Sequence, residues 1–428
     1  MAFEDIQDLE ALVVSQSKAA RQASFEMATL PTERKNAVLM KMAELCLQNK
    51  ARIQEANAVD LENGKNAGLS SAMLDRLKLH DARIDAMVEG LKQVAGLPDP
   101  VGEEIERMDP PTGLDIRKIR VPIGVIGIIY ESRPNVTIDC AALCIKSGNA
   151  AILRGGKEAF HSNQALANII AEALESEGVD RNAVSLIPTV DRQALNILLK
   201  QDEYIHCIIP RGGEALIRFV AENSMIPVIK HYKGVCNVYL DALADPEKAV
   251  SITINAKCQR PGVCNAIENL FVHESLVSTL FPKVAAELLA KGVQLRVSED
   301  LLPVLSGADI QASVATEEDF YEEYLDLILS VKSVSSTEEA IRMVNRYGSG
   351  HSDAIITEDE TNAKLFLSGV DASTVYWNAS TRFTDGFEFG LGAEIGISTD
   401  RLHARGPMGL RELCTYKFQI FGKGEIRG

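Results

Sequence analysis

One stretch of the sequence combines a thiol, a cation and a loop signal in a way that suits covalent catalysis. Cys264 follows the loop signal Pro261-Gly262 and precedes the apolar, β-rich run 266–272. A side chain at such a loop-to-strand junction can face a cleft, and the positive charge of Arg260 nearby favours the thiolate. A thiolate there could attack an acyl carbon. The alternative is that Cys264 is a small buried apolar residue, as most free cysteines are.

The elements that hold Cys264 are predicted from hydrophobic periodicity. Residues 4–96 have the spacing of helices, and residues 113–121 alternate apolar with charged side chains, as a ribbon strand with one solvent-facing side would. From 123 to 241, and again from 266 to 377, short apolar runs alternate with helical stretches. This alternation predicts mostly parallel, doubly wound sheets with ligands at the carboxyl ends of the strands.

The expected positions within these two blocks follow from the same pattern. Strands are expected at 123–130, 150–154, 183–187, 205–209, 227–229, 266–272, 325–331, 354–356 and 374–376. Helices are expected near 157–178, 191–200, 213–223, 275–291, 337–346 and 360–368.

The composition argues against several classes of partner. The formal charge of −16 disfavours nucleic acid and anionic membranes, because both repel an acidic protein. Apolar runs are too short to span a membrane, and the acidic start of the chain leads us to expect no secretory signal. The eight cysteines form neither a dense disulfide framework nor a convincing metal-ligand spacing, so we expect reduced thiols, no metal and a cytoplasmic location.

Motifs in several parts of the chain resemble one enzyme family. The residues are Asn-Ala-Lys-x-Gln-Arg-Pro-x-x-Cys-Asn at 255–265, Asn-Ala-Ser-Thr-Arg-Phe-Thr-Asp-Gly at 378–386, Phe-Gly-Leu-Gly-Ala-Glu at 389–394, His-Ala-Arg-Gly-Pro-Met-Gly-Leu at 403–410, and the segment 122–135. These motifs, in their order along the chain, resemble those of the gamma-glutamyl phosphate reductase family, a branch of the aldehyde dehydrogenase superfamily. The resemblance extends from about Asn36 to Lys417.

The resemblance implies an α/β, aldehyde-dehydrogenase-like fold with two doubly wound lobes and a small β-ribbon oligomerisation element. Residues 1–105 and 122–250 would form the dinucleotide-binding domain, and 251–377 the catalytic domain that carries the nucleophilic cysteine. Residues 106–121 and 405–428 would form the oligomerisation element. A plain surface hairpin is the alternative for the ribbon.

The family resemblance also implies a reaction. Cys264 would attack L-glutamyl 5-phosphate, release phosphate and form a thioester, which NADPH would reduce to L-glutamate 5-semialdehyde in proline biosynthesis. Asn265 completes the Cys-Asn pair of the family and is expected at the same catalytic site. A homo-oligomer is implied, and glutamate 5-kinase is suggested as the partner that supplies the labile substrate.

Cofactor residues are expected after two strands of the first block. By the resemblance, Lys157 would lie near the adenosine ribose, and because Arg154 adds a second cation, the pair would suit the 2′-phosphate of NADPH. Gly212 and Gly213 precede a helix, where exposed N–H groups could hold the pyrophosphate; a structural turn is the alternative. Glu323 would bind the nicotinamide ribose by resemblance, with Glu322 as the alternative carboxylate.

The remaining expected site residues would bind the substrate and the oxyanion. If Pro134 aligns with the last proline of the relatives' motif, Ser132 takes the position of their oxyanion-hole asparagine, and Asn135 is another candidate donor. A backbone N–H next to Cys264 would be the second donor. For the anionic groups of the substrate we expect three arginines, because a guanidinium pairs bidentately with carboxylate or phosphate. These are Arg260, Arg382 and Arg405. Surface salt bridges are the alternative for each.

Three positions differ from patterns common among relatives. His231-Tyr232-Lys233-Gly234 stands where aldehyde-oxidising relatives carry a water-activating glutamate, so no carboxylate is expected there. Asn237 stands where the family commonly has histidine, and Cys258 where threonine or serine is common. The alternatives to the reductase are a CoA-acylating or simple aldehyde dehydrogenase of the same fold, and a catalytically silent homologue that acts as a binding partner.

Overall fold

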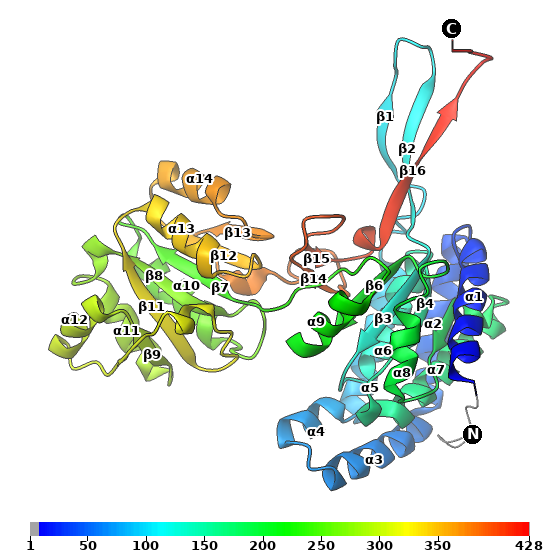
Figure 1. Ribbon diagram of the computed structural model, residues 1–428, viewed down its shortest axis with the longest axis horizontal. Coiled ribbons are helices and arrows are strands. Elements are labelled where there is room, and N and C mark those ends of the chain that lie inside the picture. Colours follow the sequence, from blue (N-terminus) through cyan, green and yellow to red (C-terminus); the bar gives the residue numbers. More distant parts are fainter. Residues whose placement is uncertain (1–7, 428) are drawn as a thin grey trace. The chain divides into compact units, whose positions relative to one another are not determined.

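The computed structural model describes residues 8–427, so the part of the expected helical region at 4–7 lies outside the described residues. The chain divides into two compact units. The first comprises Met1–Lys230, Gly390–Gly396 and Met408–Gly428, and the second comprises His231–Phe389 and Ile397–Pro407. Figure 1 colours both along the sequence.

The first unit begins with helices, as the periodicity predicts. They are α1 (Leu9–Met27), α2 (Thr32–Gln48), α3 (Lys50–Asn66), α4 (Ser71–Leu77) and α5 (Asp81–Gly96). Apolar residues at helical spacing face inward: Val38, Leu39, Met42 and Cys46 of α2 are fully buried.

A four-stranded parallel sheet follows, in the order β5-β4-β3-β6. Its strands are β3 (Val125–Tyr130), β4 (Ala150–Arg154), β5 (Val184–Leu186) and β6 (Cys207–Arg211). All residues of β3 are buried, which explains its continuous apolar sequence. The chain steps from β3 outward to β4 and β5 and then returns to the other side of β3 with β6. The carboxyl ends of β3 and β6 therefore form a topological switch point, where ligands of such sheets bind.

Helices cover both faces of this sheet (Figure 1). Helices α1, α8 (Arg192–Leu198) and α9 (Glu214–Asn223) share one core cluster with inward residues of β3, β4 and β6. Helices α6 (Asn135–Lys146) and α7 (Phe160–Ser176) connect β3 to β4 and β4 to β5, and right-handed crossovers place both on the other face. The expected strand at 227–229 is only a single bridge, between Ile208 and Val228.

The ribbon predicted at 113–121 is confirmed as a strand. Strand β2 (Asp115–Pro122) pairs antiparallel with β1 (Glu104–Met108) on one side and with β16 (Cys414–Phe421) on the other. The three strands form a separate sheet in the order β1-β2-β16 (Figure 1). A segment near the end of the chain thus completes a ribbon that begins before residue 110.

The second unit contains a seven-stranded sheet in the order β10-β9-β11-β8-β7-β12-β13, in which every pairing is parallel. The strands are β7 (Cys236–Leu240), β8 (Ile267–His273), β9 (Gln294–Val297), β10 (Ser313–Val314), β11 (Ile328–Val334), β12 (Ser352–Ile356) and β13 (Thr374–Trp377). The helices are α10 (Pro246–Cys258), α11 (Phe281–Ala290), α12 (Leu302–Gly307), α13 (Thr337–Tyr347) and α14 (Glu360–Gly369).

The second unit starts earlier than the boundary expected at residue 251. Strand β7, which the sequence analysis missed, lies between β8 and β12 in the second sheet, so the chain has entered this unit by His231. The strand expected at 325–331 is β11 and begins at Ile328 instead. Leu325 has a positive φ of 53°, which a β-strand does not allow, and this conformation delays the start of β11. Two short strands, β14 (Gly396–Ser398) and β15 (Gly406–Met408), pair with each other.

Candidate active site

Cys264 lies in the turn between α10 and β8 and is partly exposed. The backbone of Gly234 packs directly against it: a Cβ at Gly234 would lie 2.3 Å from the Cys264 carbonyl oxygen and 2.5 Å from its Cα. Real Cβ atoms do not approach so closely, so only glycine fits at this position. Gly234, the last residue of the segment His231–Gly234 that carries no carboxylate, is thereby held against the expected nucleophile.

A second thiol and a histidine lie beside Cys264, and the sequence analysis did not single out either. Cys236 at the start of β7 donates a hydrogen bond from Sγ to the Cys264 carbonyl oxygen at 3.1 Å, and its Sγ lies 3.6 Å from His351 Nδ1. Burial raises the pKa of the Cys236 thiol well above its ordinary range. Burial lowers the pKa of His351 to about 3, and nearby His231 adds to this effect. Cys236 is therefore a neutral donor that fixes the backbone of the nucleophile.

Asn265 ties the Cys264 turn to the segment after β13. Its Nδ2 donates to the Thr384 carbonyl at 2.9 Å, and its own carbonyl accepts a hydrogen bond from Thr381 Oγ1 at 2.7 Å. These two bonds flank Arg382, which sits in the short 3₁₀ turn Thr381–Phe383. The side chain of Asn265 is buried, so its observed contacts are those of a residue that positions the loop.

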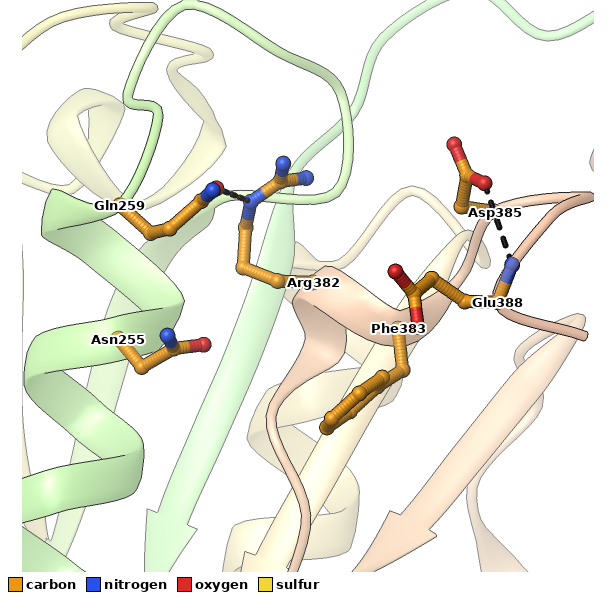
Figure 2. Close-up of a pocket in the computed structure, with 6 residues that line it drawn as sticks. All are labelled: Asn255, Gln259, Arg382, Phe383, Asp385 and Glu388. Carbon is orange, nitrogen blue, oxygen red and sulfur yellow. Dashed lines mark hydrogen bonds between the residues drawn. The ribbon is translucent and has the colours of Figure 1, made fainter.

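Arg382 lines a pocket of about 240 Å³ in the second unit. Its Nε donates to Gln259 Oε1 at 3.0 Å, as Figure 2 shows. Burial lowers the pKa of the guanidinium, and Arg260 lowers it further, whereas the Cys264 thiolate would raise it. Arg382 is therefore close enough to interact electrostatically with both Arg260 and Cys264. The lining residues are Asn255, Gln259, Arg382, Phe383, Asp385 and Glu388.

The other two expected substrate arginines differ from Arg382. Arg260 is exposed, and within the described part of the chain its guanidinium has no hydrogen-bond or ion-pair partner. Arg405 is not among the residues that line the pocket. Its Nη2 instead donates to Asp371 Oδ1 at 2.9 Å and to the Asp371 carbonyl at 3.2 Å. Hydrogen bonding to Arg405 helps to lower the pKa of Asp371, so the expected substrate ligand is a partner of a carboxylate of its own chain.

Glu323 lies in the loop before β11. Two residues further on, Leu325 contacts β8, the strand that follows Cys264. Leu325 N donates to Glu268 Oε1 at 3.3 Å, and Glu268 stands on β8. The alternative carboxylate, Glu322, is exposed and lies 3.6 Å from Lys233 Nζ. Glu323 is therefore anchored near the catalytic turn by its neighbour Leu325, and it stays the expected ligand of the nicotinamide ribose.

In the first unit, the cofactor residues lie at the carboxyl edge of the parallel sheet. Lys157 follows β4, is exposed, and has no side-chain partner within residues 8–427. Arg154 ends β4 and donates to the Gly155 and Val190 carbonyls at 3.2 and 3.3 Å, but its buried Nε has no partner among the residues that the structure describes. An unpaired lysine beside a guanidinium with an unused donor suits an anionic group such as a 2′-phosphate.

Gly212 and Gly213 are placed as expected, between β6 and α9 at the switch point. The N–H of Gly213, however, already donates to Glu131 Oε2 at 2.9 Å, and a Cβ at Gly212 would lie 2.3 Å from the same oxygen. Glu131 follows β3, the neighbouring strand. The Glu131 carboxylate thus accepts the hydrogen bond of the Gly213 N–H group that was expected to face a pyrophosphate.

The two expected oxyanion donors, Ser132 and Asn135, both have partners in the first unit. Ser132 has a positive φ of 47°, and its N–H and hydroxyl both donate to Glu158 Oε1, at 2.5 and 2.9 Å. Asn135 begins α6, and its Nδ2 donates to Asp139 Oδ2 at 2.8 Å. The amide of Asn135 carries a second N–H, whereas the two donors of Ser132 are both used.

Asn237, the residue that replaces a common histidine, is buried in the second sheet. Its N–H and Nδ2 both donate to Asp353 Oδ1, at 2.9 and 2.6 Å, and its Oδ1 accepts from Asn269 Nδ2 at 2.9 Å. These residues lie side by side on β12, β7 and β8. Asn237 thus joins three strands by hydrogen bonds, and its observed partners are structural.

Three general features bear on other functions. Across residues 8–427, no group of three or more His, Cys, Asp or Glu side chains is arranged to hold a metal ion. Within the same residues, every helix is too short or too polar to cross a membrane. Within the described residues, the eight cysteines form no disulfide bond with one another.

Comparison with known proteins gives a consistent result. The model of the aldehyde dehydrogenase family matches residues 7–323 and 304–393. The gamma-glutamyl phosphate reductase of Opitutus terrae is 54% identical over 98% of this chain and 99% of its own length. The enzyme of the same name from Geobacter metallireducens is 54% identical over 95% of this chain and 97% of its own.

A solved structure agrees with these relatives. The crystal structure of gamma-glutamyl phosphate reductase from Thermotoga maritima has a TM-score of 0.95 to this chain and 45% sequence identity. The match covers 97% of this chain and 100% of the other. The fold of this chain thus closely matches that of a solved gamma-glutamyl phosphate reductase, the name that the two sequence relatives also carry.

Proposed function

The chain belongs to the gamma-glutamyl phosphate reductase family, a branch of the aldehyde dehydrogenases, and from this premise we propose how its residues carry out the reaction. The chain is an oxidoreductase that reduces L-glutamyl 5-phosphate to L-glutamate 5-semialdehyde with NADPH, releasing phosphate, in proline biosynthesis. The observation that carries the assignment of the nucleophile is the Cys264 turn, whose backbone is held by Gly234 and Cys236 while its thiol stays partly exposed.

Cys264 acts first. Its thiolate attacks the acyl carbon of the substrate, the sulfur–carbon bond forms, and the carbon–oxygen bond to phosphate breaks as phosphate leaves with the electron pair. Arg382 and Arg260 favour the thiolate by their positive charge, and both can balance the charge of the anionic substrate. When Cys264 later leaves the reduced carbon, its sulfur departs as thiolate and the aldehyde is released.

NADPH supplies the hydride that reduces the thioester carbon. Lys157 and Arg154 would hold its 2′-phosphate, because one is unpaired and the other keeps an unused buried donor. Glu323 would hold the nicotinamide ribose. Gly212 and Gly213 would meet the pyrophosphate only after Glu131 has moved from the Gly213 amide.

The oxyanion that forms on the acyl carbon needs hydrogen-bond donors. Of the two expected side chains, Asn135 is the one that we assign, because its amide keeps a second N–H while both donors of Ser132 bind Glu158. A backbone N–H of the Cys264 turn is the second donor. Asn265 supports the site by holding that turn to Thr381 and Thr384.

The residues around Cys264 favour a reductase over a hydrolysing aldehyde dehydrogenase. Gly234 packs on Cys264, and the segment that it ends, His231–Gly234, contains no carboxylate to activate water. The buried glutamate of the adjoining strand, Glu268, is bonded to Lys257 at 2.6 Å. A thioester at Cys264 would therefore survive until hydride transfer.

The test is oxidation in the reverse direction with pyrroline-5-carboxylate and NADP⁺, with and without phosphate. We expect reduced-nicotinamide absorbance only with phosphate, in wild type and in the matched control Cys258→Ala, but not in Cys264→Ala. Phosphate-independent reduction would point to a hydrolysing aldehyde dehydrogenase. Absence of turnover in wild type under every condition would favour the catalytically silent homologue.

The partners follow as further proposals. The exposed apolar residues of β16 support a homo-oligomer built through the ribbon. A complex with glutamate 5-kinase would protect the labile acyl phosphate, and co-purification of the two proteins tests it. Eight free cysteines support a reducing, cytoplasmic location.

A further inference from the structure

The pocket beside Arg382 contains opposite charges that do not pair with each other. Arg382 lines it together with two carboxylates, Asp385 and Glu388. The amides of Asn255, in the last turn of α10, and of Gln259, the residue after this helix, complete the polar lining, and Phe383 is its apolar member. Figure 2 shows Arg382 between the two amides and the two carboxylates.

The hydrogen bonds of these residues leave donors and acceptors available. Arg382 uses its Nε on Gln259, and no other hydrogen bond or ion pair of its guanidinium occurs within the described residues. Asp385 Oδ1 accepts the Phe387 and Glu388 N–H groups at 2.8 and 3.4 Å, and its Oδ2 has no partner there. The Glu388 carboxylate likewise has none within residues 8–427.

Arg382 is close enough to Asp385 for the carboxylate to raise the pKa of the guanidinium, yet the two do not form an ion pair. A pocket that separates an unsatisfied cation from unsatisfied carboxylates is complementary to a zwitterion. A free phosphate or another purely anionic group would meet both carboxylates and be repelled. The lining therefore favours a group that carries an ammonium and a carboxylate together.

We propose that this pocket binds the α-amino-acid end of the substrate, an inference that rests on the proposed function. The Arg382 guanidinium binds the α-carboxylate, and Asp385 with Glu388 binds the α-ammonium. Asn265 Nδ2 donates to the Thr384 carbonyl and Thr381 Oγ1 donates to the Asn265 carbonyl, and these two bonds fix this segment to the Cys264 turn, so the γ-acyl group is directed to the thiol. Asp385 and Glu388 are thereby specificity residues for amino-acid substrates.

The experiment compares two aldehydes that differ only in the amino group. Glutamate 5-semialdehyde, supplied as pyrroline-5-carboxylate, has the ammonium, whereas 5-oxopentanoate lacks it but keeps the carboxylate. Both are oxidised with NADP⁺ and phosphate, and the ratio of the two kcat/KM values is the readout. Wild type should prefer the amino aldehyde.

The variants are chosen to keep the fold. Asp385→Asn retains the Oδ1 acceptor of the turn, and Glu388→Gln is isosteric and breaks no bond within the described residues. Each should lower kcat/KM for the amino aldehyde about tenfold, as loss of a charge-assisted hydrogen bond does, and change that for 5-oxopentanoate less than about twofold. Arg382→Gln should lower both, because both aldehydes carry the carboxylate.

The matched control is Glu360→Gln on α14, which removes a carboxylate outside the pocket and should leave the ratio unchanged. Turnover of 5-oxopentanoate reports folding in Asp385→Asn, Glu388→Gln and Glu360→Gln, and circular dichroism reports it in Arg382→Gln. An unchanged ratio in Asp385→Asn and Glu388→Gln, with that turnover intact, would overturn this inference alone. Loss of phosphate-dependent turnover of both aldehydes in wild type would overturn the proposed function and this inference with it.

Discussion

Lys257 and Glu268 form a fully buried ion pair, with 2.6 Å between Nζ and Oε2. Lys257 stands in the last turn of α10 and Glu268 on β8, so the pair closes the base of the loop that carries Cys264. Glu268 Oε1 also accepts the Leu325 N–H, which joins the Glu323 segment to the same base. Burial opposes ionisation of both groups by raising the pKa of Glu268 and lowering that of Lys257, and their mutual attraction opposes these shifts.

Lys257→Met should destabilise the protein by about 3–5 kcal/mol, because it leaves a buried carboxylate without its cation. Lys257→Met/Glu268→Leu should recover most of this loss, since it removes both charges. Urea unfolding followed by circular dichroism measures both. Lys248→Met is the control: it breaks an exposed pair with Glu358 and should hardly shift the midpoint. A single variant as stable as wild type would contradict this role of the pair.

Iodoacetamide should label Cys264 first among the eight cysteines of the native protein. Six of them are buried, and only Cys258 and Cys264 are partly exposed. Burial raises the pKa of the Cys258 thiol, which slows its alkylation. Peptide mass spectrometry at short times measures the order of labelling. Cys258→Ser should leave the first labelled site unchanged, and early labelling at any other cysteine would count against Cys264 as the reactive thiol.

Asp353→Asn should change how stability depends on pH. Burial raises the pKa of the Asp353 carboxyl from 3.8 to about 7. Between these values the folded state binds more protons than the unfolded state, so wild-type stability falls as the pH rises through this window and is level above it. At about 1.4 kcal/mol per pKa unit, the loss is at most about 4 kcal/mol.

The variant does not titrate at this position, so its free energy of unfolding relative to wild type should rise between pH 3.8 and pH 7 and then stay constant. Urea unfolding below, within and above the window measures the difference. Asp202→Asn, an exposed site in the first unit, is the control and should show no such rise. A constant difference for Asp353→Asn would mean that this carboxyl ionises normally in the fold.

Lys157→Ala should raise the KM for NADPH by about tenfold and leave the KM for NADH nearly unchanged. The lysine has no partner within residues 8–427, so its charge is available to the 2′-phosphate that NADH lacks. Initial rates with each nucleotide give the two KM values. Lys92→Ala on α5 replaces another exposed lysine and serves as control. Equal losses with NADPH and NADH would place Lys157 elsewhere on the cofactor.

Phe418→Asp should dissociate the proposed oligomer. Tyr416, Phe418 and Ile420 follow one another on one side of β16 and are 50%, 51% and 58% exposed, which is unusual for large apolar side chains. A charge within such an interface should weaken association by about 2 kcal/mol or more. Size-exclusion chromatography with light scattering measures the mass. Gln419→Asp, on the opposite side of the strand, should leave it unchanged, and a wild-type monomer would exclude the ribbon as an interface.

The sequence by itself determined the features that depend on neighbouring residues. Pro261-Gly262 ends the helix that precedes Cys264, and the apolar run after it forms β8, so the nucleophile was predicted at its loop-to-strand junction. The same local logic predicted β3 as a buried strand and β2 as a ribbon. Lys157 after β4 likewise follows from the alternation of strands and helices.

The tertiary structure decided what surrounds these residues, because the contacts join segments far apart in the chain. The pairing of β7 with β8 and β12 brings Cys236 and His351 beside Cys264, and no local pattern predicts that pairing. The Arg405 guanidinium binds the Asp371 carboxylate, although more than thirty residues separate the two in the sequence. The pocket at Arg382 lies between the end of α10 and the segment after β13. Only the packing of these two elements brings Arg382, Asp385 and Glu388 into one pocket.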